Sequence, residues 1–63
     1  MKVYVIITEC KTTGDIKVSQ EGYSSYEAAV AFINRRSDNP VKIDYWYYEG
    51  NSYFYEIKEI SIH

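Results

Sequence analysis

The chain has 63 residues, a formal net charge of −2 at pH 7, one cysteine and one histidine. A chain this short forms a single domain, here residues 1–63, and buries only about 60% of its unfolded surface. One cysteine excludes an intrachain disulfide, and one Cys with one His excludes a common zinc cage within the chain, so we expect no metal and no cofactor. The dispersed Lys and Arg residues lack the positive patch of a duplex-binding protein.

The first predicted element is a β-strand over residues 2–8. Both of its alternating sets are mostly apolar, which is typical of a central strand. The apolar run is too short for a secretion signal, and Thr8-Glu9 ends it without a small-residue cleavage site. No run approaches the roughly 20 residues that span a bilayer. With a lone thiol, this predicts a cytoplasmic protein, in the host cytoplasm if a phage encodes it, and no membrane partner.

A turn over residues 12–15 and a half-exposed strand over residues 16–20 complete a first hairpin. The one convincing helix comes next: Ser24 is the expected N-cap, and Glu27 three residues later forms a capping box. Arg35 and Arg36 fall in the last turn, where the helix dipole favours cations, and Pro40 ends the helix. The apolar stripe of the helix comprises Tyr26, Ala29, Val30 and Ile33, flanked by Phe32.

Residues 41–48 and 52–62 predict a third and a fourth strand, joined by a turn at residues 49–52. A two-residue turn would pair Tyr48 with Tyr53. A three-residue connection instead pairs Tyr47 with Tyr55, and we favour it because it keeps both apolar sets on one face and matches opposite charges.

The apolar residues of the fourth strand change parity along its length. Ile57 belongs to one alternating set, whereas Ile60 and Ile62 belong to the other. A strand changes faces only through an extra residue, so we expect a β-bulge near Lys58-Glu59.

The predicted fold is α+β, with the element order ββαββ: a four-stranded antiparallel sheet with one helix packed on one face. The first and fourth strands, which are the most apolar, are expected to be neighbours at the centre. The face beneath the helix is expected to carry Val3, Val5, Ile7, Ile43, Tyr45 and Ile57, together with Tyr47, Tyr53 and Tyr55. The opposite face is expected to carry Tyr4, Ile6, Trp46, Tyr48 and Phe54.

Seven aromatic residues lie within eleven positions, 45–55, and part of this cluster falls on that opposite face. Exposed apolar patches usually mark an interaction site, and Tyr and Trp are enriched in binding hot spots. We therefore predict a non-catalytic protein-interaction module, either a homodimer or bound to another protein, that uses this face or an exposed edge strand. The predicted interface is Tyr4, Ile6, Trp46, Tyr48 and Phe54.

The aromatic residues also have two roles that would not need a protein partner. Cross-strand aromatic pairs stabilise a small hairpin by themselves. Alternatively, a single-stranded nucleic-acid-binding module would stack bases on the exposed rings. Such modules add a basic groove, which the dispersed charge of this chain does not provide.

No catalytic residues are predicted, and the chain is not expected to be an enzyme. Cys10 has only His63, an expected frayed end, as a possible imidazole partner, so a small edge thiol is the simpler interpretation. Arg35 and Arg36, with Lys11 or Lys17, could form a small basic spot, although two arginines also end a helix well.

The stretch of residues 22–29, Gly-Tyr-Ser-Ser-Tyr-Glu-Ala-Ala, followed by Phe32-Ile33, resembles a recurring pattern in small ββαββ proteins of Gram-positive bacteria and their phages. Their helix opens with a Ser/Thr-Tyr-Glu-Glu-Ala phrase after a short β-hairpin. Here Ala28 replaces the second acidic residue. The resemblance implies a phage, prophage or accessory gene product that acts through contacts, and it assigns no catalytic residue.

Overall fold

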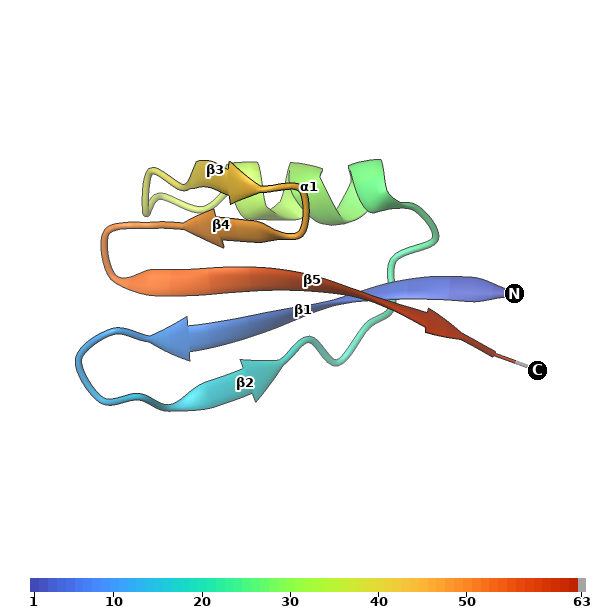
Figure 1. Cartoon of the computed structure of the whole chain (residues 1–63), viewed down its shortest axis with the longest axis horizontal. Helices are drawn as coiled ribbons and strands as arrows, with labels where there is room; N and C mark the ends of the chain where they lie inside the picture. Colours follow the sequence, from blue (N-terminus) through green and yellow to red (C-terminus); the bar gives the residue numbers. More distant parts are fainter. Residues whose placement is uncertain (63) are drawn as a thin grey trace.

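The computed structural model describes residues 1–62 and shows a five-stranded antiparallel sheet with one short helix (Figure 1). The elements are β1 (Lys2–Cys10), β2 (Ile16–Val18), α1 (Tyr26–Asn34), β3 (Val41–Asp44), β4 (Tyr47–Glu49) and β5 (Tyr53–Ser61). The strand order is β2-β1-β5-β4-β3, so the expected central pair, here β1 and β5, is confirmed. We call the sheet face beneath α1 the covered face and the other the open face.

The four-stranded prediction is wrong because the expected third strand is two strands. A turn at residues 45 and 46 separates β3 from β4, which pair with each other. The Tyr26 hydroxyl of α1 donates a hydrogen bond of 2.5 Å to the Tyr45 carbonyl, and the Tyr26 and Tyr45 rings stack at 4.1 Å. The run of aromatic residues therefore extends through a turn and not along one strand, because Tyr26 of the helix packs against Tyr45 in that turn.

Neither predicted register of the last hairpin is correct. Tyr48 lies opposite Tyr55, and Glu49 lies opposite Phe54. The cause is Asp38, whose carboxylate accepts hydrogen bonds from the backbone N–H groups of Ser52 (2.9 Å) and Tyr53 (3.1 Å). A residue far away in the sequence thus shapes this turn.

The expected bulge near Lys58-Glu59 is also wrong. β1 and β5 pair without a break from Lys2 opposite Ser61 to Cys10 opposite Tyr53. The irregularity in the sheet lies instead between Lys42 and Asp44. β5 simply carries apolar residues on its covered face at one end and on its open face at the other.

The predicted faces of β1 are reversed. Ile6 lies opposite Ile57 on the covered face and is 1% exposed, so Val3, Val5 and Ile7 point to the open face. Both alternating sets of β1 are apolar, so its own sequence does not choose between the faces, and its pairing with β5 decides. The buried core consists of Ile6, Ala29, Ile33, Tyr48, Tyr55 and Ile57.

The helix begins one residue later than expected. Ser25, not Ser24, is the N-cap, and its Oγ accepts a hydrogen bond of 3.1 Å from the Ala28 N–H. The apolar stripe is confirmed, with Ala29 and Ile33 fully buried. Arg35 is the C-cap, and the last turn of α1 contains no basic residue.

Candidate functional site

The open face is the first candidate site, because no second layer formed by residues 1–62 covers it. Directly opposite residues in an antiparallel pair share a face, and Ile7 lies opposite both Val18 and Glu56. Among residues 1–62, α1 is the one element outside the sheet that packs on it, and it does so on the covered face. The apolar residues of the open face are Val3, Val5, Ile7, Ile16, Val18, Val41, Tyr47, Phe54 and Ile60.

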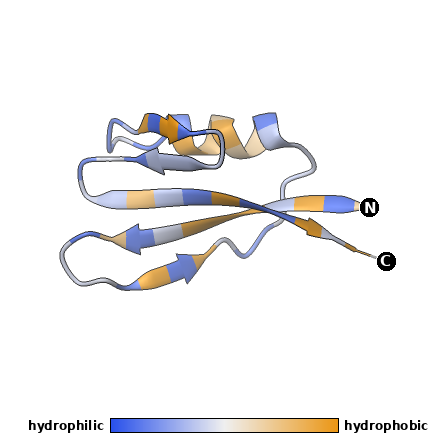
Figure 2. Ribbon diagram, in the orientation of Figure 1, coloured by the Kyte–Doolittle hydropathy of each residue, from blue (hydrophilic) through white to orange (hydrophobic). Residues whose placement is uncertain are grey.

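Several of these side chains remain accessible to solvent. Ile16 is 63%, Val18 56% and Ile60 41% exposed, against 5% or less for every residue of the core. Figure 2 shows hydrophobic segments on β2, on β3 and near the end of β5. Accessible apolar side chains gathered on one face in this way often mark an interaction site.

The charges of the open face are separated along the strands. Lys58 lies opposite Val5, whereas Glu56 and Glu9 lie further along the sheet, opposite Ile7 and Phe54. Burial, followed by the charges of Glu9, Glu49 and Glu56, raises the pKa of the Tyr47 hydroxyl. One end of the face is therefore basic and aliphatic, and the other is acidic and aromatic.

Lys11 belongs to the acidic end but does not neutralise it. Its Nζ forms an ion pair of 2.7 Å with Glu49 and lies 5.0 Å from the centroid of the Phe54 ring. The Phe54 ring in turn stacks on Tyr47 at 5.9 Å. These contacts fix the aromatic pair in place on the surface.

The structure separates the five residues expected to form the interface. Phe54 lies on the open face, whereas Ile6 and Tyr48 are buried in the core. Tyr4 and Trp46 stack on each other at 6.4 Å on the covered side. Val3, Val5 and Ile7, which were expected under the helix, lie on the open face instead, and no pattern within β1 itself distinguishes the two faces.

The rings of the β3–β4 turn are used in packing against the helix. Trp46 meets Tyr26 edge-on at 5.5 Å, and Tyr26 stacks on Tyr45. Burial and a hydrogen bond with Tyr48 raise the pKa of Tyr26 to about 12. Most of the aromatic cluster therefore stabilises the covered side of the fold.

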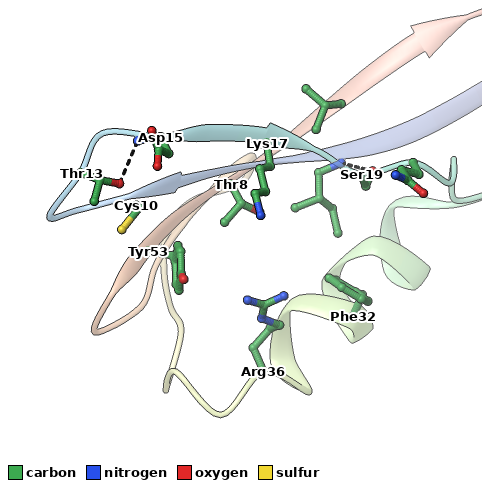
Figure 3. Close-up of a pocket in the computed structure, with 12 residues that line it drawn as sticks. Thr8, Cys10, Thr13, Asp15, Lys17, Ser19, Phe32, Arg36 and Tyr53 are labelled. Atoms are coloured by element: carbon green, nitrogen blue, oxygen red, sulfur yellow. Dashed lines mark hydrogen bonds between the residues drawn. The ribbon is translucent and has the colours of Figure 1, made fainter.

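The second candidate site is a cleft of about 530 Å³ on the covered side, between the β1–β2 hairpin and the end of α1 (Figure 3). It forms because α1 packs on β1 and β5 and leaves β2 bare. Its floor and walls include Ile6, Thr8 and Cys10 of β1, Lys17 of β2, Phe32 and Arg36 at the helix end, and Tyr53 of β5.

Arg36 and Lys17, two of the residues considered for a basic spot, both line this cleft. Arg35 does not line the cleft, and Lys11 is paired elsewhere with Glu49. The Arg36 guanidinium carbon lies 5.7–5.9 Å from the centroids of three rings, those of Phe32, Tyr53 and Tyr55. Such contacts attract a cation and restrict its orientation.

Cys10 lies at the other end of the cleft. Its Sγ is 3.2 Å from the Thr12 Oγ1, and hydrogen bonds from Thr12 and then Thr13 lower the pKa of the Cys10 thiol to about 7. No histidine occurs within residues 1–62, and the expected partner His63 lies outside the described residues. Within the described residues, the geometry gives a partly accessible thiol with no imidazole beside it.

The chain matches no family model, no curated protein and no solved structure. The resemblance to small proteins of Gram-positive bacteria and their phages stays a prediction. Within residues 1–62, no helix has the length and apolar character needed to cross a membrane. The same residues contain no group of three or more His, Cys, Asp or Glu side chains able to bind a metal.

Proposed function

We propose that this protein is a non-catalytic binding module that docks a second copy of itself against its open face. The observation that supports this most directly is the one-sided cover of the sheet, since a single helix packs on one face and the other keeps accessible aliphatic and aromatic side chains. Burial of apolar surface drives most protein association.

The charge pattern favours a second copy over an unrelated partner. A two-fold dimer brings the same surface of each copy together, so that surface must be complementary to itself. In an antiparallel arrangement, Lys58 of each copy approaches the end that carries Glu9 and Glu56. The Cα extents of 37 × 20 × 18 Å make the broad face slightly smaller than the about 800 Å² per partner of a standard interface, so docking has to use most of the face.

The face is a better docking surface than the edges of the sheet. The edge strands β2 and β3 have three and four residues, and β3 carries an irregularity at Lys42. Short or bulged edges are devices that prevent strand addition. Two open faces packed as a sandwich would instead bury the exposed Ile16, Val18 and Ile60.

Nucleic-acid binding gains no support from the geometry. Glu9, Glu49 and Glu56 lie around the half-buried ring of Phe54, and this charge repels a phosphate backbone. Trp46, the ring best suited to base stacking, is held on the covered side by Tyr4 and Tyr26.

Analytical ultracentrifugation over a concentration series tests the proposal. The wild-type chain is expected to dimerise, and Val18→Glu is expected to weaken the dimer at least about tenfold, because a buried unpaired charge is costly. Ser37→Glu adds the same charge after the helix, away from the open face, and should leave the dimer unchanged.

Two results would contradict self-association. One is a wild-type chain that stays monomeric up to about 1 mM, which corresponds to about −4 kcal/mol of binding free energy. The other is a dimer that Val18→Glu and Ser37→Glu weaken equally, because the interface would then lie elsewhere.

A further inference from the structure

We propose that the cleft between the β1–β2 hairpin and the end of α1 binds a small organic carboxylate that carries an apolar body. The two parts of the site are a pair of cationic side chains and an apolar wall. The cleft lies on the covered side, so this inference is independent of docking at the open face.

The size of the cleft suits a small molecule. Its volume of about 530 Å³ falls within the range of about 300–1,000 Å³ that is usual for ligand pockets. The fold creates it, because Lys17 lies opposite Thr8 on the covered side of the sheet, where α1 does not reach. A second layer of protein is therefore absent above β2 within residues 1–62.

Two cations converge on this space. Figure 3 shows the Lys17 ammonium and the Arg36 guanidinium pointing into the cleft from opposite walls, with the Thr8 side chain beside Lys17. Neither cation forms an ion pair with any described residue; the ion pairs found there join Lys2 to Glu59 and Lys11 to Glu49.

The orientation of Arg36 is fixed in advance. Its guanidinium is placed over the rings of Phe32, Tyr53 and Tyr55, at 5.7–5.9 Å from their centroids. A planar guanidinium held in this way can bind a carboxylate with two parallel hydrogen bonds and loses little entropy in doing so. The Lys17 side chain is flexible, so its ammonium can approach the same carboxylate as a second positive charge.

The other residues that line the cleft determine which apolar group of a ligand fits beside the carboxylate. Ile6, Phe32 and Tyr53 form an apolar wall beside the two cations, and the Thr8 hydroxyl adds one polar group. Asp15 lies nearer the hairpin tip and offsets part of the positive charge, which favours a singly charged carboxylate over a phosphate dianion. An aromatic or branched acid satisfies both parts of the site.

Titration with 3-phenylpropionate, followed by the backbone amide NMR signals, tests the inference, and neutral 3-phenylpropanamide serves as the matched ligand. We expect saturable shifts centred on Thr8, Lys17 and Arg36 with the acid, and binding at least about tenfold weaker with the amide. Lys17→Gln should weaken binding of the acid severalfold. Lys58→Gln, which removes the same charge from the open face, should not.

Cys10 provides a second readout. A bound acid covers the cleft, so the rate of alkylation of the Cys10 thiol by iodoacetamide should fall in proportion to occupancy. N-acetyl-Ala-Phe distinguishes the two sources of such a carboxylate. Tighter binding than that of 3-phenylpropionate assigns the cleft to a peptide carboxyl terminus, and weaker binding assigns it to a free acid.

Three results would overturn the inference. They are shifts that do not saturate, equal affinity for the acid and its amide, and equal loss of affinity in Lys17→Gln and Lys58→Gln. Arg36→Lys keeps the charge but removes the planar fork, so unchanged affinity in that variant would also reject the proposed role of Arg36. Ile60→Glu, which places the same kind of charge on the open face but outside the lining of the cleft, should leave the titration unaltered.

Discussion

The two faces of the sheet have similar apolar content, but their side chains differ in solvent exposure. On the covered face, Ile6, Tyr55 and Ile57 are 2% exposed or less, because α1 packs on them. On the open face, Ile16 and Val18 remain more than half exposed. The comparison shows that the apolar content of a strand does not determine whether its side chains are buried. What determines their burial is how far the helix layer extends over the sheet.

The reach of α1 also explains why the cleft exists. A helix of nine residues is only about 13.5 Å long. It packs on β1 and β5 and leaves the covered side of β2 bare. The same short helix thus produces a tight core over the central strands and a cavity beside them.

The largest difference between the two faces is expected in stability. Ile57→Ala should lower the free energy of unfolding by about 2–5 kcal/mol, because it leaves a cavity under the helix. A loss of this size is comparable with the whole stability expected for a domain this small. Val18→Ala on the open face should cost no more than about 0.5 kcal/mol in the monomer.

Urea unfolding monitored by far-ultraviolet circular dichroism, at a concentration where the chain is monomeric, measures both variants. Equal losses in Ile57→Ala and Val18→Ala would show that the two faces are buried to the same extent in the monomer, against the structure.

The β4–β5 turn offers the next largest effect. A Cβ added at Gly50 would meet the Asp38 carboxylate at a distance that no real contact allows. Gly50→Ala must therefore displace Asp38 from Ser52 and Tyr53, and the midpoint of thermal unfolding should fall. Gly14→Ala is the matched control, because its Cβ would meet nothing within 4 Å and only its left-handed backbone is strained. A smaller loss in Gly50→Ala than in Gly14→Ala would contradict the importance of the Asp38 contacts.

A smaller effect is expected from acid. Burial alone would raise the pKa of the Asp38 carboxyl, but hydrogen bonds from Ser52, Tyr55 and Tyr53 outweigh it, and the pKa lies below the ordinary value of 3.8. A depressed folded-state pKa stabilises the fold above the unfolded value, and this contribution is lost as the pH falls below about 3.8 through the folded value.

Thermal unfolding between pH 2 and pH 6 should therefore show a steeper loss of stability below about pH 4 in the wild-type chain than in Asp38→Asn. Asp15→Asn removes a carboxylate without these three partners and serves as the control. Parallel curves for the wild type and Asp38→Asn would show that the Asp38 hydrogen bonds are not formed in solution.

The sequence allowed the helix, its stripe, both hairpin positions and the central pair of strands to be predicted, because these depend on local patterns. The faces of β1 were not predictable, since Val5 and Ile6 are equally apolar and only the pairing of Ile6 with Ile57 distinguishes them. The register of the last hairpin depends on Asp38, and the split of the third strand depends on Tyr26. Both are contacts between segments that are distant along the chain.

The candidate sites were predictable to different extents. An uncovered sheet face follows from one helix and a small domain, and was predicted, but of the five residues named for it only Phe54 lies there. The cleft could be predicted only by knowing where β2 and the end of α1 lie in space. The one feature of the sequence that indicated it was the expected basic spot, which included Arg36 and Lys17.

The central claim is that a second copy docks on the open face. The most direct test is paramagnetic relaxation by a soluble gadolinium chelate, measured at the methyl groups of Val5, Ile7 and Val18 in dilute and in concentrated protein. We predict that relaxation at these methyl groups falls with concentration, while that at Val30 on the helix stays constant. Open-face methyl groups that remain equally accessible at every concentration would contradict the claim.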